Sequence, residues 1–282
     1  MNCIPLKRDA KGRFVARDPR DADRVRKAAV PLAYTDVCVN PNRAHRLYWT
    51  ARDKAGRTQY RYTRAWRAGA NARKYGRLAD VGKAMSEVRA RVARDLRLPV
   101  KSGERSRARE VAAIVGILDS CRMRPGARRY MKRSGARGAT TVEPPNLDAG
   151  RRRLKWRAKR GKTRTCDLST DPALVRALPS SLGRVTAVRL NDWLRPHGIT
   201  AKDVRTWHAN ALYVGALRRG ASAADCVRAA AEGLGNTPSV CRNNYLAPRV
   251  LAAQLASDLP RPPKTVPARL SDDEAVLLRM FQ

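Results

Sequence analysis

The balance of charged residues restricts this chain more than any other feature of its sequence. Among 282 residues, 60 are Lys or Arg and 24 are Asp or Glu, so the formal net charge is +36. Self-repulsion of this size is typical of proteins with a polyanionic partner, and nucleic acid is a better candidate than an acidic membrane surface. Apolar residues make up 43% of the sequence, close to the globular average, which is sufficient for a packed core.

No membrane span and no secretory leader are expected. The longest apolar run, Val111 to Leu118, has eight residues, whereas a spanning helix needs about 20. The first residues have no apolar stretch of signal length. Six cysteines are scattered without a Cys-x-x-Cys pair: Cys3, Cys38, Cys121, Cys166, Cys226 and Cys241. We therefore expect reduced thiols in an intracellular protein, with neither a disulfide framework nor a metal site.

Two segments are expected before the main domain. Residues 1–33 are charged, contain Gly and Pro and have little periodicity, which predicts a flexible basic arm. Residues 34–100 are expected to form a β-rich domain, because apolar residues between Val37 and Tyr62 fall at strand-like spacing around a turn at Arg52–Gly56. Apolar residues that recur every three or four positions from Leu78 predict a helix of about 25 residues, which ends near Pro99 and should complete this domain.

The main domain is expected over residues 101–257, with its boundary at Lys101–Glu104. An apolar stripe around Val111 to Leu118 predicts a helix, and the extended pattern of residues 139–168 predicts a second small sheet. Helices should return after Pro172, so the expected class is α+β: a small antiparallel β domain followed by a mainly α-helical one with a small sheet.

Capping signals place the last helices. Ser222 precedes a helix that should end at Gly235, and Thr237-Pro238 is typical of the start of a helix, here a short one with Tyr245 on it. Residues 258–282 are expected to be a Pro-rich linker and a helix capped by Ser271, which packs on its own domain or on a partner.

The densest basic run, Arg151 to Arg164, has nine Lys or Arg in fourteen residues and no acid. Gly161-Lys162-Thr163 suggests a phosphate-binding loop, but that motif needs glycine five positions earlier, where Trp156 stands. An ATP site is therefore excluded. The run is interpreted as a solvated basic hairpin that contacts backbone phosphates.

Several side chains suit phosphate chemistry but also have ordinary structural interpretations. Lys202 and Arg205 share a helix face, as basic solvent positions often do. Arg124 follows a helix and can satisfy its terminal carbonyls. A single tyrosine such as Tyr245 is far more often packed than nucleophilic.

Near the N-terminus, Tyr60 and Tyr62 alternate with Gln59 and Arg61. The two tyrosines suit a nucleic-acid groove or the core of a small sheet equally well.

Seven segments, taken together and in order, resemble the poxvirus-like and bacterial type IB DNA topoisomerases. They are Gly56–Tyr62, Arg73–Leu78, Arg124–Tyr130, Gly138–Thr141, Trp156–Lys162, Lys202–Trp207 and Leu234–Pro248. The resemblance extends from about residue 40 to residue 255, and its last two segments are the most specific. It implies the tyrosine recombinase/type IB topoisomerase fold for the main domain.

The resemblance also implies roles for individual residues. Tyr245 would attack a DNA phosphodiester and become linked to the 3′ phosphate, while Arg124 and Arg205 hold the non-bridging oxygens. Lys159 would protonate the departing 5′ oxygen. Such roles agree with the chemistry, because a phosphoryl transition state spreads negative charge over oxygens that fixed guanidinium groups can match.

Further positions follow from the same resemblance. Lys202 aligns with another basic residue beside the phosphate, and Asn236 aligns with a histidine of the poxvirus enzymes. The expected DNA-binding residues are Gln59, Tyr60, Tyr62, Tyr130, Arg157, Arg160 and Lys162. The sequence departs from the family pattern at Pro125, Ala127 and Ala158, so a poxvirus-like sequence preference is not expected.

The resemblance implies relaxation of supercoiled DNA by transient single-strand cleavage and religation, without ATP, metal or another cofactor. The expected partner is double-stranded DNA, clamped by a monomer in the bacterial cytoplasm or nucleoid, or in a virion or infected cell. A tyrosine recombinase is one alternative, although recombinases usually have His-x-x-Arg where this chain has Lys202-x-x-Arg205. A non-catalytic basic DNA-binding protein is the other.

Overall fold

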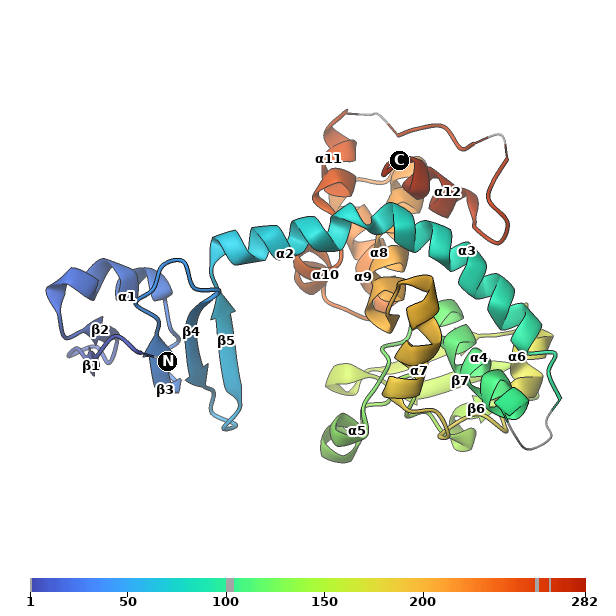
Figure 1. Ribbon diagram of the computed structural model, residues 1–282, viewed down its shortest axis with the longest axis horizontal. Coiled ribbons are helices and arrows are strands. Elements are labelled where there is room, and N and C mark those ends of the chain that lie inside the picture. The colour runs from blue at the N-terminus through green and yellow to red at the C-terminus, as the bar shows by residue number, and fades with distance from the viewer. Residues whose placement is uncertain (1, 100–103, 257–258, 264) are drawn as a thin grey trace. The chain divides into compact units, whose positions relative to one another are not determined.

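The computed structural model describes residues 2–99, 104–256, 259–263 and 265–282. The chain divides into two compact units, an N-terminal unit, Met1–Gly76, and a C-terminal unit, Arg77–Gln282 (Figure 1). Both combine helices with small antiparallel sheets, in agreement with the expected α+β class.

A three-stranded sheet forms the centre of the N-terminal unit, as the alternating pattern predicts. Its antiparallel strands are β3 (Thr35–Val39), β4 (Leu47–Arg52) and β5 (Thr58–Tyr62), in that order. The turn between β4 and β5 is closed by Asp53, whose carboxylate accepts hydrogen bonds from the backbone of Ala55 and Arg57. Helix α2 (Arg64–Gly76), which the sequence did not predict, follows β5.

Residues 2–33 are folded, so the prediction of a flexible arm over residues 1–33 is wrong for the described part of it. They form β1 (Leu6–Arg8), β2 (Phe14–Ala16), the 3₁₀ turn η1 (Pro19–Asp21) and α1 (Ala22–Ala28). Ile4, Val25 and Ala28 are buried against the sheet, and Trp49 Nε1 donates a hydrogen bond of 2.9 Å to the Ala28 carbonyl. Strands of three residues are too short to produce a periodic pattern, which explains the failed prediction.

Four of the six cysteines form disulfides, contrary to the expectation of reduced thiols. Cys3 is bonded to Cys38 in the N-terminal unit, and Cys121 to Cys166 in the C-terminal unit. Partners are 35 and 45 residues apart, so local spacing gives no sign of the pairing. The remaining two, Cys226 and Cys241, are buried thiols as expected.

Helix α8 (Ala201–Arg218) lies at the centre of the C-terminal unit and packs against α3, α4, α7, α9, α11 and α12 (Figure 1). Trp207 and Tyr213 of α8 are fully buried. The other helices are α3 (Leu78–Asp95), α4 (Glu104–Ser120), α5 (Arg128–Ser134), α6 (Pro172–Ala177), α7 (Ala187–Leu194), α9 (Ala223–Leu234), α10 (Pro238–Asn244), α11 (Pro248–Ala256) and α12 (Asp272–Arg279). Short 3₁₀ turns are η2 (Pro144–Asn146), η3 (Lys159–Gly161) and η4 (Arg195–His197).

The division between the units falls after Gly76, and not at Lys101 as expected. Helix α3 ends at Asp95, short of Pro99, and it packs on α4 and α8, which makes it part of the C-terminal unit. Residues 101–103 of the expected boundary lie outside the described residues.

A second antiparallel sheet contains β6 (Leu147–Asp148), β7 (Arg153–Arg157) and β8 (Thr163–Asp167). In β7, Leu154 and Trp156 are buried, whereas Arg153, Lys155 and Arg157, which alternate with them, are exposed. This is the basic hairpin expected from the sequence, and η3 forms its turn.

The C-terminal helix α12 packs on its own unit, against α3 and α8. Ser271 and Glu274 form the expected capping box at its start. The buried Glu274 carboxylate accepts a 2.8 Å hydrogen bond from Trp207 Nε1 and pairs with Arg89 at 2.8 Å. Residue 257, at the end of the expected main domain, and residues 258 and 264 of the expected Pro-rich linker lie outside the described part. Within the described part, every helix is too short or too polar to span a membrane.

Candidate phosphate-binding active site

One pocket of the C-terminal unit collects basic residues from separate elements. It is lined by Arg124, Lys159, Arg160, Lys162, Gly235, Asn236, Thr237 and Val240. Four of these described lining residues are cationic and none is acidic. A pocket with this lining is suited to an anion rather than to an apolar ligand.

Arg124 lies in the loop between α4 and α5, and a neighbouring segment holds this loop in place. The Arg124 carbonyl accepts a 2.8 Å hydrogen bond from the Ala139 backbone, and a Cβ on Gly138 would lie 2.5 Å from the same oxygen. The Arg124 guanidinium donates a hydrogen bond to Asn236 Oδ1. Burial lowers the pKa of Arg124, Tyr245 opposes this effect, and Arg160 adds to it.

Arg205, on α8, is almost fully buried. Its guanidinium donates hydrogen bonds to the Arg122 carbonyl and, at 2.9 Å, to the Leu234 carbonyl at the end of α9. Burial lowers the pKa of Arg205 to about 10, with further lowering by Arg124 and an opposing effect of Tyr245. The centre of the Tyr245 ring lies 5.6 Å from Arg205 Cζ, so the aromatic ring and the buried cation are neighbours.

The backbone on both sides of Tyr245 is fixed by one buried side chain, Asn210 of α8. Asn210 donates a 2.9 Å hydrogen bond to the Tyr245 carbonyl and accepts one of 2.8 Å from the Ala247 backbone. Tyr245 caps the C-terminus of α10 and is half-buried. The sequence interpretation missed Asn210, because an asparagine inside a helix carries no local signal of a tertiary role.

Lys159 lies at the tip of the basic hairpin, in η3, and its side chain is exposed. The turn is closed by a 2.7 Å hydrogen bond from the Ala158 backbone to the Lys162 carbonyl, and Arg160 and Gly161 adopt positive φ angles. Among the described residues, no hydrogen bond or ion pair engages the Lys159 ammonium. It is therefore free to contact a ligand in the pocket.

Two donors at the site are buried without a hydrogen-bond partner in the described part of the chain: Arg205 Nε and Asn236 Nδ2. An unsatisfied buried donor costs about 1–3 kcal/mol. An anion that accepted these hydrogen bonds would remove that cost.

Other expected site residues are less closely associated with the pocket. Arg205, Tyr245 and Lys202 are not among the residues that line the pocket, and Lys202 is exposed on the first turn of α8. Tyr130, on α5, is exposed, with the Arg129 guanidinium 4.9 Å from its ring centre. Arg157 is exposed on β7 of the basic hairpin.

In the N-terminal unit, Tyr60 and Tyr62 are 57% and 40% exposed, so the alternative of core tyrosines is wrong. The amide of Gln59 is occupied by a 2.9 Å hydrogen bond to Asp53. The structure adds Trp66 of α2, which is exposed and has the guanidinium of Arg73 5.4 Å from its ring centre. Trp66 was missed because α2 itself was not predicted.

Comparison with known proteins gives a distant relative named as a topoisomerase. No protein-family model matches the sequence. The chain is 24% identical over 225 residues to a protein named DNA topoisomerase 1B from Acanthamoeba polyphaga mimivirus. The match covers 70% of this chain and 65% of the viral protein, so the chain spans less than two thirds of that relative's length. This similarity supports a distant relationship to a type IB topoisomerase.

Proposed function

We propose that this protein is a type IB DNA topoisomerase, and that its C-terminal unit has the tyrosine recombinase/type IB topoisomerase fold. The main support is the arrangement of Arg205, Arg124 and Asn236 beside Tyr245, with two buried donors that have no partner within the described residues. The similarity to the viral topoisomerase supports the same function. The reaction relaxes supercoiled DNA and uses neither ATP nor metal.

In the proposed cleavage step, Tyr245 Oη forms a bond to the phosphorus of a DNA phosphodiester while the bond from phosphorus to the 5′ oxygen breaks. The phenol proton passes to solvent, and the Lys159 ammonium gives a proton to the leaving 5′ oxygen. The phosphotyrosyl bond conserves the energy of the broken phosphodiester. The free 5′ end then swivels about the intact strand, and the reverse reaction reseals the DNA.

The cations stabilise the charge that develops in this step. Arg124 and Arg205 donate to the non-bridging oxygens, and Asn236 Nδ2 supplies an uncharged donor. Removal of a single donor of this kind typically slows an enzyme about 10²- to 10³-fold. Burial strengthens these interactions, because the local dielectric is low. Lys202 is proposed to act from the surface on DNA phosphates.

Duplex DNA is the proposed partner of both units, bound by a monomer. In the C-terminal unit, Tyr130, Arg157, Arg160 and Lys162 contact the backbone. In the N-terminal unit, the exposed Tyr60, Tyr62 and Trp66 contact a groove, with Gln59 beside them. Most of the affinity is sequence-independent, because it comes from phosphate neutralisation.

Of the expected locations, the two disulfides favour the virion over a reducing cytoplasm. Disulfides persist on virions and in other oxidising environments, and they are rare in cytosolic proteins. A protein packaged with DNA in a virus particle would both bind DNA and keep its disulfides oxidised.

Supercoiled plasmid incubated with the protein in EDTA, without ATP, tests the function. We expect relaxation in steps of one linking number, and loss of relaxation in Tyr245→Phe with DNA binding retained. A wild-type protein that binds plasmid and leaves it supercoiled at every salt concentration is a non-catalytic DNA-binding protein. Strand exchange between duplexes in place of relaxation would identify a recombinase.

A further inference from the structure

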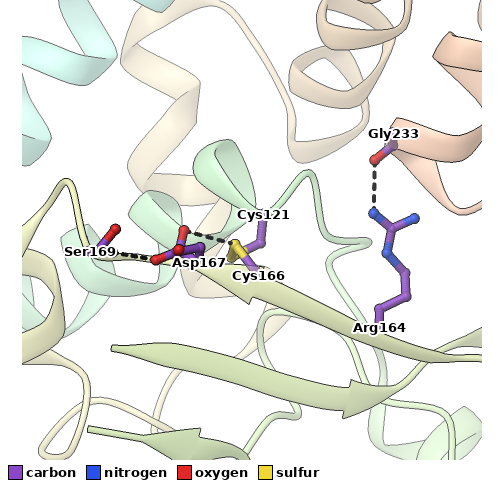
Figure 2. Close-up of a disulfide and its surroundings, with 6 residues drawn as sticks. All are labelled: Cys121, Arg164, Cys166, Asp167, Ser169 and Gly233. Atoms are coloured by element: carbon purple, nitrogen blue, oxygen red, sulfur yellow. Dashed lines mark hydrogen bonds between the residues drawn. A yellow bond between two sulfur atoms is a disulfide. The ribbon is translucent and has the colours of Figure 1, made fainter. Parts of the chain in front are cut away.

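Strand β8 connects the Lys159 turn to two other parts of the candidate site. Its residues alternate in exposure: Arg164 and Cys166 are half-buried, whereas Thr163, Thr165 and Asp167 are exposed. Arg164 and Cys166 therefore share the face that meets the helices. Figure 2 shows Arg164 reaching Gly233 and Cys166 bonded to Cys121.

Arg164 caps the helix that leads into the site. Its guanidinium donates hydrogen bonds of 2.8 Å to the Glu232 carbonyl and 3.0 Å to the Gly233 carbonyl, both in the last turn of α9. Carbonyls in the last turn of a helix have no partner within the helix, and a cation there also interacts favourably with the helix dipole. Arg164 therefore attaches the basic hairpin to the end of α9.

The contact continues directly into the pocket. Gly235 ends α9 with a φ of +62°, and a Cβ at this position would lie 2.4 Å from Arg164 Nη1. Any residue with a side chain at 235 would displace Arg164. The next residue is Asn236, which accepts the hydrogen bond from Arg124.

Arg164 lies at this position despite electrostatic repulsion. Burial lowers its pKa, and so do Arg122 and Arg124 nearby. Among the described residues, Arg164 makes no ion pair with an acidic side chain, so the two carbonyl hydrogen bonds hold it among the other cations.

We propose that Arg164 is a positioning residue, which fixes Lys159 at the distance from Arg124 and Asn236 that proton transfer requires. This inference rests on the proposed topoisomerase function. Lys159 is exposed on a turn that is closed by its own backbone hydrogen bond, so the turn moves together with β8. On the β7 side of the turn, the buried Trp156 and a 2.8 Å hydrogen bond from the Arg137 backbone to the Arg157 carbonyl hold the hairpin. On the β8 side it is held by Arg164 and, two residues further along the strand, by the Cys166 disulfide. A general acid must lie within hydrogen-bond reach of the leaving oxygen.

The test uses single-turnover formation of the covalent protein–DNA adduct on a duplex whose cleavage site has been mapped with the wild type. The site has either the normal 5′ oxygen or a bridging 5′ sulfur, a leaving group that needs no proton. For Arg164→Ala we expect cleavage of the oxygen substrate to slow about 100-fold, the cost of a misplacement of about 1 Å. The sulfur substrate should recover most of that loss, and Arg164→Lys should lie between Arg164→Ala and the wild type.

Arg228→Ala is the matched control, because Arg228 is an exposed arginine on the same helix α9, where it pairs with Asp225. It should cleave both substrates at the wild-type rate. Equal slowing of both substrates in Arg164→Ala, or no slowing, would overturn the positioning role. If Arg164→Ala does not fold, the ratio of the two rates in Arg164→Lys decides by the same criterion. A wild type that forms no adduct with either substrate would instead overturn the proposed function, and the inference with it.

Discussion

The guanidinium of Arg124 donates a hydrogen bond to Oδ1 of Asn236, a residue 112 positions away in the sequence. Because an arginine can only donate, the amide oxygen must face Arg124 and the amide nitrogen must point away. Asn236 Nδ2 is buried without a partner in the described residues, so it is an oriented donor. In the proposed phosphate site, the uncharged Asn236 would therefore act as a hydrogen-bond donor.

Replacement of Asn236 by Asp changes the size of the side chain very little, but it should slow adduct formation strongly. The carboxylate would pair with Arg124, repel a phosphate and remove the Nδ2 donor, so we expect adduct formation to slow at least as much as for loss of one donor, about 10²- to 10³-fold. Asn236→Gln, which keeps the amide, is the control. Asn236→Asp cleavage at the wild-type rate would remove this residue from the phosphate site.

The two disulfides can be tested by counting the cysteines that react with an alkylating reagent before and after reduction. Burial raises the pKa of Cys226, and burial raises the pKa of Cys241 to about 11, so neither thiol should react quickly in the native protein. Alkylation followed by mass spectrometry should label two cysteines in denatured, unreduced protein. After reduction it should label all six. More than two labels before reduction, in protein purified without reductant, would contradict the pairing.

Acid should destabilise the C-terminal unit, because two largely buried carboxylates, Asp119 of α4 and Glu274 of α12, have lowered pKa values. Burial alone would raise the pKa of Asp119. Hydrogen bonds and charge from Arg89 and from His208, whose Nε2 lies 2.6 Å from Asp119 Oδ1, outweigh burial and hold this pKa well below its usual range. Burial would likewise raise the pKa of Glu274, but the hydrogen bonds and charge of Arg89 outweigh it, so this pKa is also lowered. Carboxylates of this kind stabilise the fold above their ordinary pKa values, near 4, and this stabilisation is lost as the pH falls through the lowered values.

The measurement is the urea midpoint between pH 7 and pH 3. We expect the midpoint to fall below about pH 4.5 as these carboxylates take up protons. Glu274→Gln should lower the free energy of unfolding at pH 7 by about 1–3 kcal/mol and flatten the decline in acid. The same pH dependence in the variant and in the wild type would assign the decline to other groups.

The N-terminal unit offers a test of aromatic contact with DNA. Truncation of an exposed aromatic anchor usually costs more than about 1 kcal/mol, so Trp66→Ala should raise the Kd for duplex DNA about tenfold. It should leave the salt dependence unchanged, because no charge is lost. Leu32→Ala, at another exposed apolar residue of this unit, is the control. An unchanged Kd in Trp66→Ala would exclude this contact.

Local signals in the sequence predicted local structure well. The alternation around Trp49 predicted the first sheet, and Ser222, Thr237 and Ser271 cap helices where expected. Helix α2 was missed because Tyr75 is its one buried residue in the described chain, so it has no apolar stripe. Signals of these kinds depend on neighbouring residues alone.

Tertiary relationships could not be predicted in this way. The fold of residues 2–33 depends on packing against Trp49, and the pairing of Cys121 with Cys166 depends on contact between β8 and the residue that follows α4. Arg124 and Lys159 were grouped through a family resemblance, and the same resemblance included Lys202, Arg205 and Tyr245, which do not line the pocket. The number of positions between two residues in the sequence does not give their distance in space when they belong to separate helices or strands.

The Cys121–Cys166 bond makes residues 121–166 a closed covalent ring, and both Arg124 and Lys159 belong to it. A protease that nicks the chain once inside this ring therefore releases no fragment while the protein is oxidised. With the covalent link to DNA proposed at Tyr245, such a ring would keep both pieces of a nicked chain attached to the nucleic acid until the break is resealed.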